Sequence, residues 1–259
     1  MTQSLTDKIV LVTGAGAGIG WGITRACVEA GATVVMAELN AGAESRALEL
    51  RQQGASVHFV QTDVSDPDSI AATIAEAKQQ FGRIDGLVNN AGVTLEGDFL
   101  DFSMEQLERL WTTNLRSVFL MCQGVARIMK EQGSGAIVNV SSNHALSSVP
   151  DYEMYAATKG GISAMSRSMC WSLGRHGIRV NTLCPGLTQT EAVAAVVQAQ
   201  PHLATAFASM HADGRYCTVG ELGAIAVFLL SEASAALTGA ELVADHGLTA
   251  NLCKVDDLK

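Results

Sequence analysis

A glycine-rich turn directly after an apolar run is the feature of this sequence that most restricts its fold. Residues 9–12 are wholly apolar, as expected of a central parallel strand that is covered on both faces. The turn that follows contains Gly14, Gly16, Gly18 and Gly20. Helical spacing then runs to Gly31. A strand, a glycine turn and a helix form half of a dinucleotide-binding unit, because the glycines let the backbone approach a pyrophosphate.

The residue at the end of the second apolar run indicates which dinucleotide is bound. Glu38 follows residues 33–37 and stands 18 residues after Gly20, close to the separation expected for a ribose-binding carboxylate. Such a carboxylate accepts hydrogen bonds from the ribose hydroxyls and repels a 2′-phosphate. Leu39 and Asn40 offer no guanidinium to a phosphate. The sequence therefore predicts NAD as the cofactor, with NADP the less favoured alternative.

Polar side chains also follow the third and fourth predicted strands, residues 57–61 and 86–89. Asp63 can accept a hydrogen bond from an adenine amino group, or it can cap the helix that begins after Pro67. Two consecutive amides, Asn89 and Asn90, are poor strand formers, so we expect them to bond the backbone or a ligand. These positions extend the predicted cofactor site along one edge of the sheet.

The chemistry is expected between residues 138 and 159. Tyr155 and Lys159 are four residues apart, so on a helix they share one face. A free phenol has a pKa of about 10 and needs a nearby positive charge to act as an acid or base near neutral pH. Lys159 can supply that charge, and Ser142, at the end of the apolar run 136–140, can hold a substrate oxygen. The alternative is a tyrosine and a lysine on a solvated helix face.

Composition limits the remaining classes of protein. The 259 residues carry a formal net charge of −9 with no basic cluster, which argues against nucleic-acid binding. No apolar run is long enough to span a bilayer, and the first eight residues carry no signal core, so we expect a cytoplasmic protein without a membrane partner. Six scattered cysteines, with no C-x-x-C pair, predict buried free thiols and a metal-free mechanism.

The helical segments in the second half have distinct signals. Residues 102–130 show helical spacing throughout and predict one long helix, in which Asn114 either is a satisfied structural amide or kinks the helix toward the site. Residues 191–210 are rich in alanine and predict a helix broken at Pro201. Residues 218–231 predict a final helix, and residues 241–244 a last strand.

Several motifs in fixed order resemble the short-chain dehydrogenase/reductase family. They are Thr13 with Gly14, Gly18 and Gly20, then Asn89 to Gly92, Asn114, Ser142, Tyr155 with Lys159, Asn181, and Pro185 with Gly186. The resemblance covers almost the whole chain. It implies one α/β domain over residues 1–259, a three-layer, doubly wound, parallel seven-stranded Rossmann-type sheet, assembled as a homotetramer or homodimer.

The resemblance also implies roles for individual residues. The implied catalytic residues are Asn114, Ser142, Tyr155 and Lys159, with Asn114 keeping a water that connects Lys159 to solvent. Motifs and resemblance together give these cofactor-binding residues: Gly14, Gly18, Ile19, Gly20, Glu38, Asp63, Val64, Asn90, Ala91, Gly92, Tyr155, Lys159, Pro185, Gly186, Thr188 and Thr190. Thr190 has an alternative role as a helix cap. A substrate lid is expected at about 188–215.

Two choices and one departure need comment. Tyr152 has Ala156 four residues on and so lacks the amine that Tyr155 has. Neighbouring strand residues face opposite sides, so only one of Ser141 and Ser142 can face the substrate, and the family pattern favours Ser142. The family commonly has Asp-Gly-Gly after the last strand, where this chain has Asp245, His246 and Gly247.

The predicted reaction is hydride transfer between a secondary alcohol and a nicotinamide, with Tyr155 moving the proton. Ser142, His144 and Tyr155 are the expected substrate contacts. His144 and Glu153 are polar and favour a sugar, polyol or sugar acid, although both can equally be surface-loop residues. A 3-oxoacyl thioester reductase is the next candidate, which Glu38 disfavours. A dinucleotide-binding regulator without turnover is the alternative outside enzymes.

Overall fold

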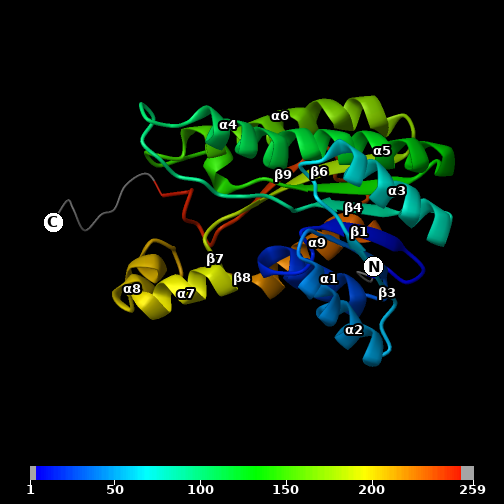
Figure 1. Ribbon diagram of the computed structural model, residues 1–259, viewed down its shortest axis with the longest axis horizontal. Coiled ribbons are helices and arrows are strands. Elements are labelled where there is room, and N and C mark those ends of the chain that lie inside the picture. The colour runs from blue at the N-terminus through cyan, green and yellow to red at the C-terminus, as the bar shows by residue number, and fades with distance from the viewer. Residues whose placement is uncertain (1–3, 252–259) are drawn as a thin grey trace.

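The computed structural model describes residues 4–251, and one parallel β-sheet lies at its centre (Figure 1). The strand order is β3-β2-β1-β4-β5-β6-β9, and every neighbouring pair is parallel. Helices cover both faces of the sheet, which gives three layers. The predicted doubly wound, seven-stranded Rossmann-type sheet is therefore confirmed.

The predicted apolar runs coincide with the strands of this sheet. The strands are β1 (Ile9–Thr13), β2 (Thr33–Glu38), β3 (Val57–Gln61), β4 (Gly86–Asn89), β5 (Gly135–Val140), β6 (Ile178–Pro185) and β9 (Glu241–Ala244). The chain proceeds from β1 outward to β3 and then returns to β4 on the other side of β1. This reversal is a topological switch point, and ligands of open α/β sheets bind at the carboxyl ends of the strands beside it.

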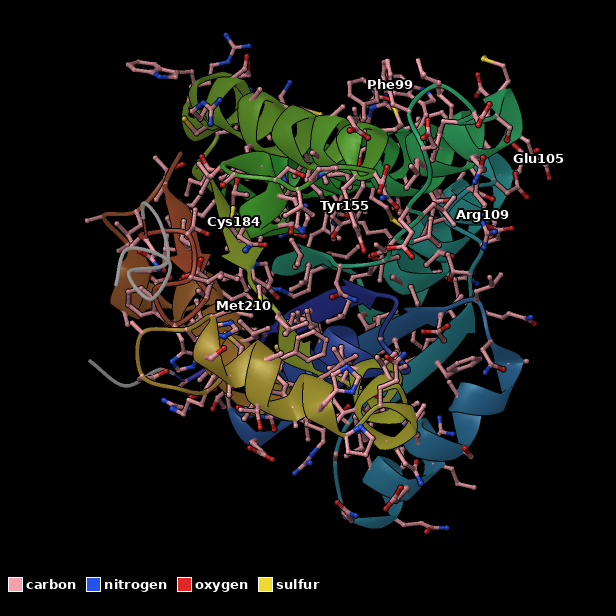
Figure 2. All side chains as sticks on the ribbon, turned by 90° about the vertical axis from the view of Figure 1, so that its left-hand side faces the viewer. Phe99, Glu105, Arg109, Tyr155, Cys184 and Met210 are labelled. Carbon is pink, nitrogen blue, oxygen red and sulfur yellow. The ribbon has the colours of Figure 1, made fainter. Side chains whose placement is uncertain are left out.

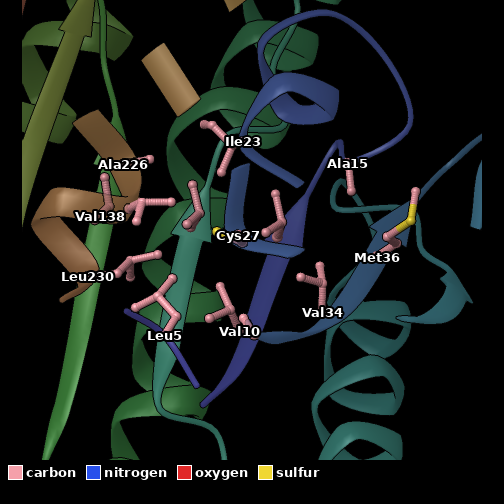
Figure 3. Packing of buried hydrophobic residues seen from close by; sticks show 14 of the residues in the cluster. Leu5, Val10, Ala15, Ile23, Cys27, Val34, Met36, Val138, Ala226 and Leu230 are labelled. Carbon is pink, nitrogen blue, oxygen red and sulfur yellow. The ribbon is translucent and has the colours of Figure 1, made fainter. Parts of the chain in front are cut away.

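Two apolar cores form, one on each face of the sheet. Val10 and Val12 of β1 point into a cluster with α1 (Gly18–Glu29), α2 (Glu44–Gln52) and α9 (Val219–Leu230) (Figure 3). Leu11 between them points into the opposite cluster, with α3 (Pro67–Phe81), α5 (Ser117–Gln132) and α6 (Glu153–Gly174). Residues 9–12 of the strand are all apolar because each face of the sheet buries every second side chain.

The segment predicted as one continuous helix, residues 102–130, differs in the structure. It consists of α4 (Met104–Leu110), a π-helical turn (Trp111–Arg116) and α5. The helix begins at Met104 because Ser103 caps it and Gln106 bonds back to the Ser103 N–H. Helical periodicity does not distinguish a π turn from an α turn, so the apolar spacing alone predicted one uninterrupted helix.

The expected break at Pro201 is present. Two short helices, α7 (Glu191–Ala199) and α8 (His202–Ser209), flank the proline. A separate two-stranded parallel pair, β7 (Thr188–Gln189) and β8 (Cys217–Thr218), brings the two ends of this segment together. Figure 1 shows α7 and α8 set apart from the three layers. The segment is thus a projecting unit fastened at its base.

The cysteines in the described part of the chain are free, and most are buried as expected. Those buried are Cys27, Cys122, Cys184 and Cys217, while Cys170 is partly exposed. Burial raises the pKa of the first three buried thiols to about 12, so they stay protonated and unreactive. Cys253 and the tail after Asn251 lie outside the described residues. Between residues 4 and 251, no helix is both long and apolar enough to cross a membrane.

His246, the departure from the family pattern, adopts a left-handed backbone conformation with φ of 50°. A side chain in this conformation costs about 1 kcal/mol relative to glycine. The imidazole contacts two carboxylates, Asp213 at 2.9 Å and Glu221 at 3.4 Å. Glu221 also accepts from the Thr218 N–H and Arg215, and these contacts lower its pKa to about 2. His246 therefore joins the turn after β9 to the end of the α7–α8 segment.

We expect the Glu221→Gln substitution to lower the melting temperature at pH 7 by about 2–4 °C, the shift that about 1 kcal/mol produces in a chain of this size. Because the folded pKa lies below the usual value, the carboxylate stabilises the fold above about pH 4.5, and this stabilisation is lost as the pH falls toward 2. Thermal unfolding at pH 7 and pH 3 measures both effects, with the surface variant Glu29→Gln as the control. An equal deficit at both pH values would contradict the prediction.

Candidate active site

The glycine turn after β1 packs too closely for other residues. A Cβ on Gly20 would lie 2.0 Å from the Gly14 carbonyl oxygen and 2.4 Å from Asn90 Nδ2. A Cβ on Gly14 would lie 2.9 Å from Ala91 Cα, and Gly14 has φ of 61°. The turn therefore requires glycine at both positions, and it brings the start of α1 to the edge of the sheet.

Asn90 fixes this turn against β4. Its Nδ2 donates to the carbonyls of Thr13 (3.0 Å) and Gly14 (3.2 Å), and its own N–H donates to Thr13 Oγ1 at 3.0 Å. Asn89 lies behind it, in the interior, and donates to Asn139 at 2.8 Å. The amides were expected to bond either the backbone or a ligand. Both side chains bond other groups of the protein. The switch point is thereby held rigid.

A cleft of about 990 Å³ opens at this edge of the sheet. The predicted cofactor residues that line it are Gly14, Gly18, Ile19, Glu38, Asp63, Val64, Asn90, Ala91, Gly92 and Thr190. Gly20 lies behind the turn instead, because its backbone packs on Gly14. Pro185, Gly186, Thr188, Tyr155 and Lys159 are not among the lining residues. The volume suits an extended dinucleotide, since ligand sites of this kind measure about 300–1,000 Å³.

Glu38 lies at the end of β2 with its carboxylate held in place. Oε2 accepts the Gly16 N–H at 2.9 Å, and Oε1 accepts the Asn40 N–H at 3.0 Å. A Cβ on Gly16 would lie 2.9 Å from Glu38 Cγ, so the glycine is needed for this close approach. The Glu38 carboxylate is thus fixed at the side of the cleft where β2 ends.

Asp63 lines the cleft and does not cap α3. Its Oδ1 accepts from Ser65 N (2.8 Å) and Ser65 Oγ (2.7 Å), whereas the cap of α3 is Asp66. The Val64 side chain beside it is buried. The alternative role of Asp63 as a helix cap is therefore wrong, and the Asp63 carboxylate stays available at the cleft.

Two charged residues that the sequence analysis missed contact the glycine turn, Glu191 and Arg46. Glu191 Oε2 accepts the Gly18 N–H at 3.0 Å, and Glu191 Oε1 accepts from Arg46 at 3.2 Å. Arg46 also donates to the Gly16 carbonyl at 2.6 Å. The acid directly after Thr190 was visible in the sequence, but nothing indicated that Arg46 of α2 reaches the same turn. The contacts tie α7 to the glycine turn.

Tyr155 and Lys159 share one face of α6, as their spacing predicts. Lys159 is 5% exposed, its Nζ donates to the Val140 carbonyl at 3.0 Å, and the same nitrogen lies 5.7 Å from the centre of the Tyr155 ring. A Cβ on Gly92 would lie 3.7 Å from this nitrogen. Gly92 lines the cleft, so the ammonium lies between the cleft and the phenol. Figure 2 shows Tyr155 at the middle of this edge, with Met210 of the α7–α8 segment across from it.

Ser141 and Ser142 face different surroundings at the end of β5. Ser141 Oγ donates to the Lys159 carbonyl at 2.8 Å in the interior. Ser142 Oγ accepts the His144 N–H and donates to Asn143 Oδ1, both at 3.2 Å. The His144 ring lies next to Tyr155, with 5.5 Å between ring centres. Of the two hydroxyls, Ser142 is thus the one on the side of His144 and Tyr155.

Asn114 lies in the π turn, fully buried. Its Oδ1 accepts the Val93 N–H and its Nδ2 donates to the Val93 carbonyl, both at 2.8 Å. A Cβ on Gly92 would lie 3.2 Å from Asn114 Oδ1. Of the two readings of Asn114, the satisfied amide agrees with these bonds, and the altered helix turn brings the amide to Val93. Asn114 thereby holds the segment at Val93 in place beside the cleft.

The turn after β6 is packed against the last strand. A Cβ on Gly186 would lie 2.5 Å from Asp245 Cβ, and Thr188 Oγ1 donates to the Gly186 carbonyl at 2.9 Å. Thr190 caps α7 by accepting the Val193 N–H at 3.3 Å, and it also lines the cleft. Thr190 therefore occupies both of its expected positions, at the cleft and at the cap of the helix.

The residues at the cleft fit a nicotinamide dinucleotide. The start of α1, whose Gly18 N–H already binds the Glu191 carboxylate, suits the anionic pyrophosphate. The Glu38 carboxylate can accept ribose hydroxyls, and the Lys159 amine lies near Gly92 at the opposite end. The fold and this cleft define a Rossmann-type dinucleotide-binding protein. The comparisons with known proteins then specify its family.

A family model described as enoyl-(acyl carrier protein) reductase matches residues 14–249. D-threitol dehydrogenase of Mycolicibacterium smegmatis is 37% identical over 246 residues, which cover 95% of this chain and 94% of that protein. Among solved structures, a gluconate 5-dehydrogenase from Burkholderia cenocepacia in complex with NADP and tartrate has a TM-score of 0.91 at 34% identity, covering 96% of this chain and 98% of that one. 7α-hydroxysteroid dehydrogenase complexed with NADH and a 7-oxo bile acid has a TM-score of 0.90 at 31% identity, covering 95% of each chain.

The chain belongs to the short-chain dehydrogenase/reductase family. It is an oxidoreductase of the class that acts on CH–OH groups with a nicotinamide dinucleotide. The predicted family and reaction class are confirmed.

We expect the Asn114→Leu substitution to destabilise the fold and weaken dinucleotide binding. The change leaves the N–H and carbonyl of Val93 without partners, at about 1–3 kcal/mol each, so the melting temperature should fall by about 4 °C or more. Thermal unfolding and a fluorescence titration with the dinucleotide measure the two effects. Thr112→Val, in the same π turn, is the control for the melting temperature alone, since the Thr112 hydroxyl bonds only within its own helix but the residue lines the cleft. An unchanged melting temperature for Asn114→Leu would refute the positioning role.

Proposed function

We propose that this protein is an NAD-dependent dehydrogenase that interconverts a secondary alcohol and a ketone on a sugar, polyol or sugar acid. The observation that carries the proposal is the position of Lys159 Nζ, between the dinucleotide cleft at Gly92 and the Tyr155 ring. An ammonium in this position acts on both the cofactor ribose and the phenol. Two relatives are named as dehydrogenases of threitol and of gluconate. The polar character of these compounds supports a hydroxyl-bearing substrate here.

The proposed roles follow from the contacts of each side chain. In the oxidation direction, Ser142 Oγ holds the alcohol oxygen and Tyr155 Oη takes the hydroxyl proton. The Lys159 ammonium stabilises the phenolate that accepts this proton, because a cation near the ring favours its charged form. When bound, a nicotinamide would supply the hydride acceptor. Asn114 positions the chain beside the cleft through Val93, and its water-holding role stays a prediction.

The remaining cofactor contacts are proposed from position. Thr190 lines the cleft, and Pro185, Gly186 and Thr188 precede it closely in the chain, which supports contacts from this segment to the carboxamide and phosphates. Residues 188–215 are proposed as the substrate lid, supported by the way β7 and β8 fasten the segment at its base. A lid of this kind excludes water from the reacting atoms.

Exposed apolar side chains support the expectation of a homotetramer or homodimer. Phe119 on α5 is 50% exposed and Trp171 on α6 is 86% exposed, so large rings lie uncovered on the outer helical layer. Side chains of this size are normally covered in a stable assembly. A cytoplasmic location likewise stays a prediction.

The experiment that tests the proposal is a panel of secondary alcohols, polyols, sugar acids, their ketones and a 3-oxoacyl thioester, each run with NAD and with NADP. We expect turnover of hydroxyl-bearing substrates with NAD. Preferred reduction of the thioester would instead establish the acyl-reductase alternative. Dinucleotide binding without turnover across the whole panel would establish the regulator alternative.

We expect the Tyr155→Phe substitution to lower kcat by about 10²–10⁴-fold, the usual contribution of a positioned acid or base. The dissociation constant for NAD should change little, because the phenol acts on the substrate proton. Steady-state rates and a cofactor titration measure the two quantities. Tyr152→Phe serves as the matched ring control for the loss of kcat on a simple mono-alcohol. Parent-like turnover by Tyr155→Phe would refute the mechanism.

We expect the Glu38→Ser substitution to raise kcat/KM for NADP relative to NAD by about tenfold or more, because like charges placed together cost several kcal/mol. The change removes the carboxylate and leaves the Arg46 guanidinium, held at the same turn, to pair with a 2′-phosphate. The double substitution with Arg46→Ala should then lose most of the gain. If Glu38→Ser left the ratio unchanged, Glu38 would not determine the preference.

A further inference from the structure

The rings of His144, Tyr152 and Tyr155 form a cluster, and Tyr155 is the residue proposed to take the substrate proton. The centres of the His144 and Tyr152 rings are 5.0 Å apart, those of His144 and Tyr155 are 5.5 Å apart, and those of Tyr152 and Tyr155 are 6.2 Å apart. Tyr152 has no amine partner and takes no part in the proposed proton transfer. It nevertheless lies beside Tyr155, the residue proposed to act on the substrate.

A carboxylate from a distant part of the sequence joins this cluster. Tyr152 Oη donates to Glu96 Oε2 at 2.7 Å, and the nearby Gly97 N–H donates to the Asp151 carbonyl at 3.0 Å. The hydrogen bond to Glu96 raises the pKa of Tyr152 to about 12, so the phenol keeps its proton and continues to donate. Glu96 thus has a fixed position beside the rings, with Oε1 left to accept from another group.

His144 also presents an acceptor. Its Nδ1 is 2.9 Å from Ser148 Oγ, and Ser148 Oγ donates to the Val149 carbonyl at 3.4 Å. With its proton so used, the serine accepts from Nδ1–H, which leaves Nε2 without a hydrogen. Burial lowers the pKa of His144, which keeps the ring neutral. Among the described residues, Nε2 has no hydrogen-bond partner.

The charged residues of the two segments that supply Glu96, His144 and Tyr152 are all acidic, whereas the Lys159 ammonium lies 5.7 Å from the centre of the Tyr155 ring and donates to the Val140 carbonyl. Residues 93–103 and 143–158 contain Glu96, Asp98, Asp101, Asp151 and Glu153, and neither stretch contains a lysine or an arginine. A substrate carboxylate or phosphate would find no counter-charge from these segments and would meet the Glu96 carboxylate. A substrate hydroxyl, which donates, would find acceptors instead.

We propose that Glu96, Tyr152 and His144 form a hydrogen-bond-accepting wall beside Tyr155 that selects an uncharged substrate with a second hydroxyl on the carbon next to the reacting one. The proposal rests on the proposed function and narrows it to vicinal diols and polyols, at the expense of hydroxy acids. Glu96 and Tyr152 are then specificity-determining residues that bind the neighbouring hydroxyl, while Ser142 and Tyr155 act on the reacting one.

A matched set of four-carbon substrates tests the wall in the full-length protein. Butane-2,3-diol, butan-2-ol and 3-hydroxybutanoate share the reacting CH₃–CH(OH) group and differ in what lies next to or beyond it. With NAD, we expect kcat/KM for the diol to exceed that for the mono-alcohol by about tenfold or more, the effect of a hydrogen bond to a charged group. The hydroxy acid should be the poorest of the three.

Two substitutions and one control locate the effect. Glu96→Gln keeps an acceptor for Tyr152 but removes the charge, so it should lower the ratio of diol to mono-alcohol by about tenfold and improve the hydroxy acid. Tyr152→Phe removes the hydroxyl that orients Glu96 and should also lower the ratio of diol to mono-alcohol. Asp98→Asn is the control, since Asp98 lies in the same loop and bonds only the Leu100 N–H. Circular dichroism checks that each variant is folded.

The outcomes separate the wall from the proposed function. Equal ratios in the parent, Glu96→Gln and Tyr152→Phe would overturn the wall while butan-2-ol oxidation upheld the dehydrogenase. A parent that prefers the hydroxy acid, or prefers mono-alcohols to diols, would also overturn it. Failure of the parent to oxidise any secondary alcohol with either cofactor would overturn the proposed function, and the wall with it.

Discussion

The hydrogen bonds between Asn90 and the end of β1 are the contact on which the site depends. Asn90 Nδ2 bonds the carbonyls of Thr13 and Gly14, and Thr13 Oγ1 accepts the N–H groups of both Asn90 and Ala91. These bonds join the two halves of the sheet where the strand order reverses. Because the junction is rigid, the glycine turn on one side and Gly92 with Lys159 on the other keep a fixed separation, and one extended ligand can reach both.

The sheet then determines which groups can act together. All seven strands are parallel, so their carboxyl ends meet at one edge and carry Glu38, Asp63, Asn90 and Ser142 to it from four different strands. The helix α6 crosses the same edge with Tyr155 and Lys159. Charges of opposite sign are thereby separated along the cleft: the Glu38 carboxylate lies at one end and the Lys159 ammonium at the other. That polarity suits a ligand with ribose hydroxyls at one end and a redox ring at the other.

Most of the sheet and the motif residues could be predicted from the sequence, because apolar runs, glycines and the tyrosine–lysine spacing are local signals. The π turn at Trp111–Arg116 could not, since Asn114 bonds Val93 across the fold and leaves the helical period almost unchanged. Arg46, Glu191 and Glu96 were missed for a similar reason. Each is an ordinary surface-type charge in sequence, and only folding brings it to Gly18 or to Tyr152.

His246 shows how a strained residue can attach one segment of a protein to another. Its left-handed backbone is one that glycine would adopt freely, yet the imidazole bridges Asp213 and Glu221. A glycine at this position would relieve the backbone but remove the imidazole from both acids, which Arg215 also contacts. Replacement of His246 by glycine should therefore exchange local strain for a looser attachment of the α7–α8 segment to the turn after β9.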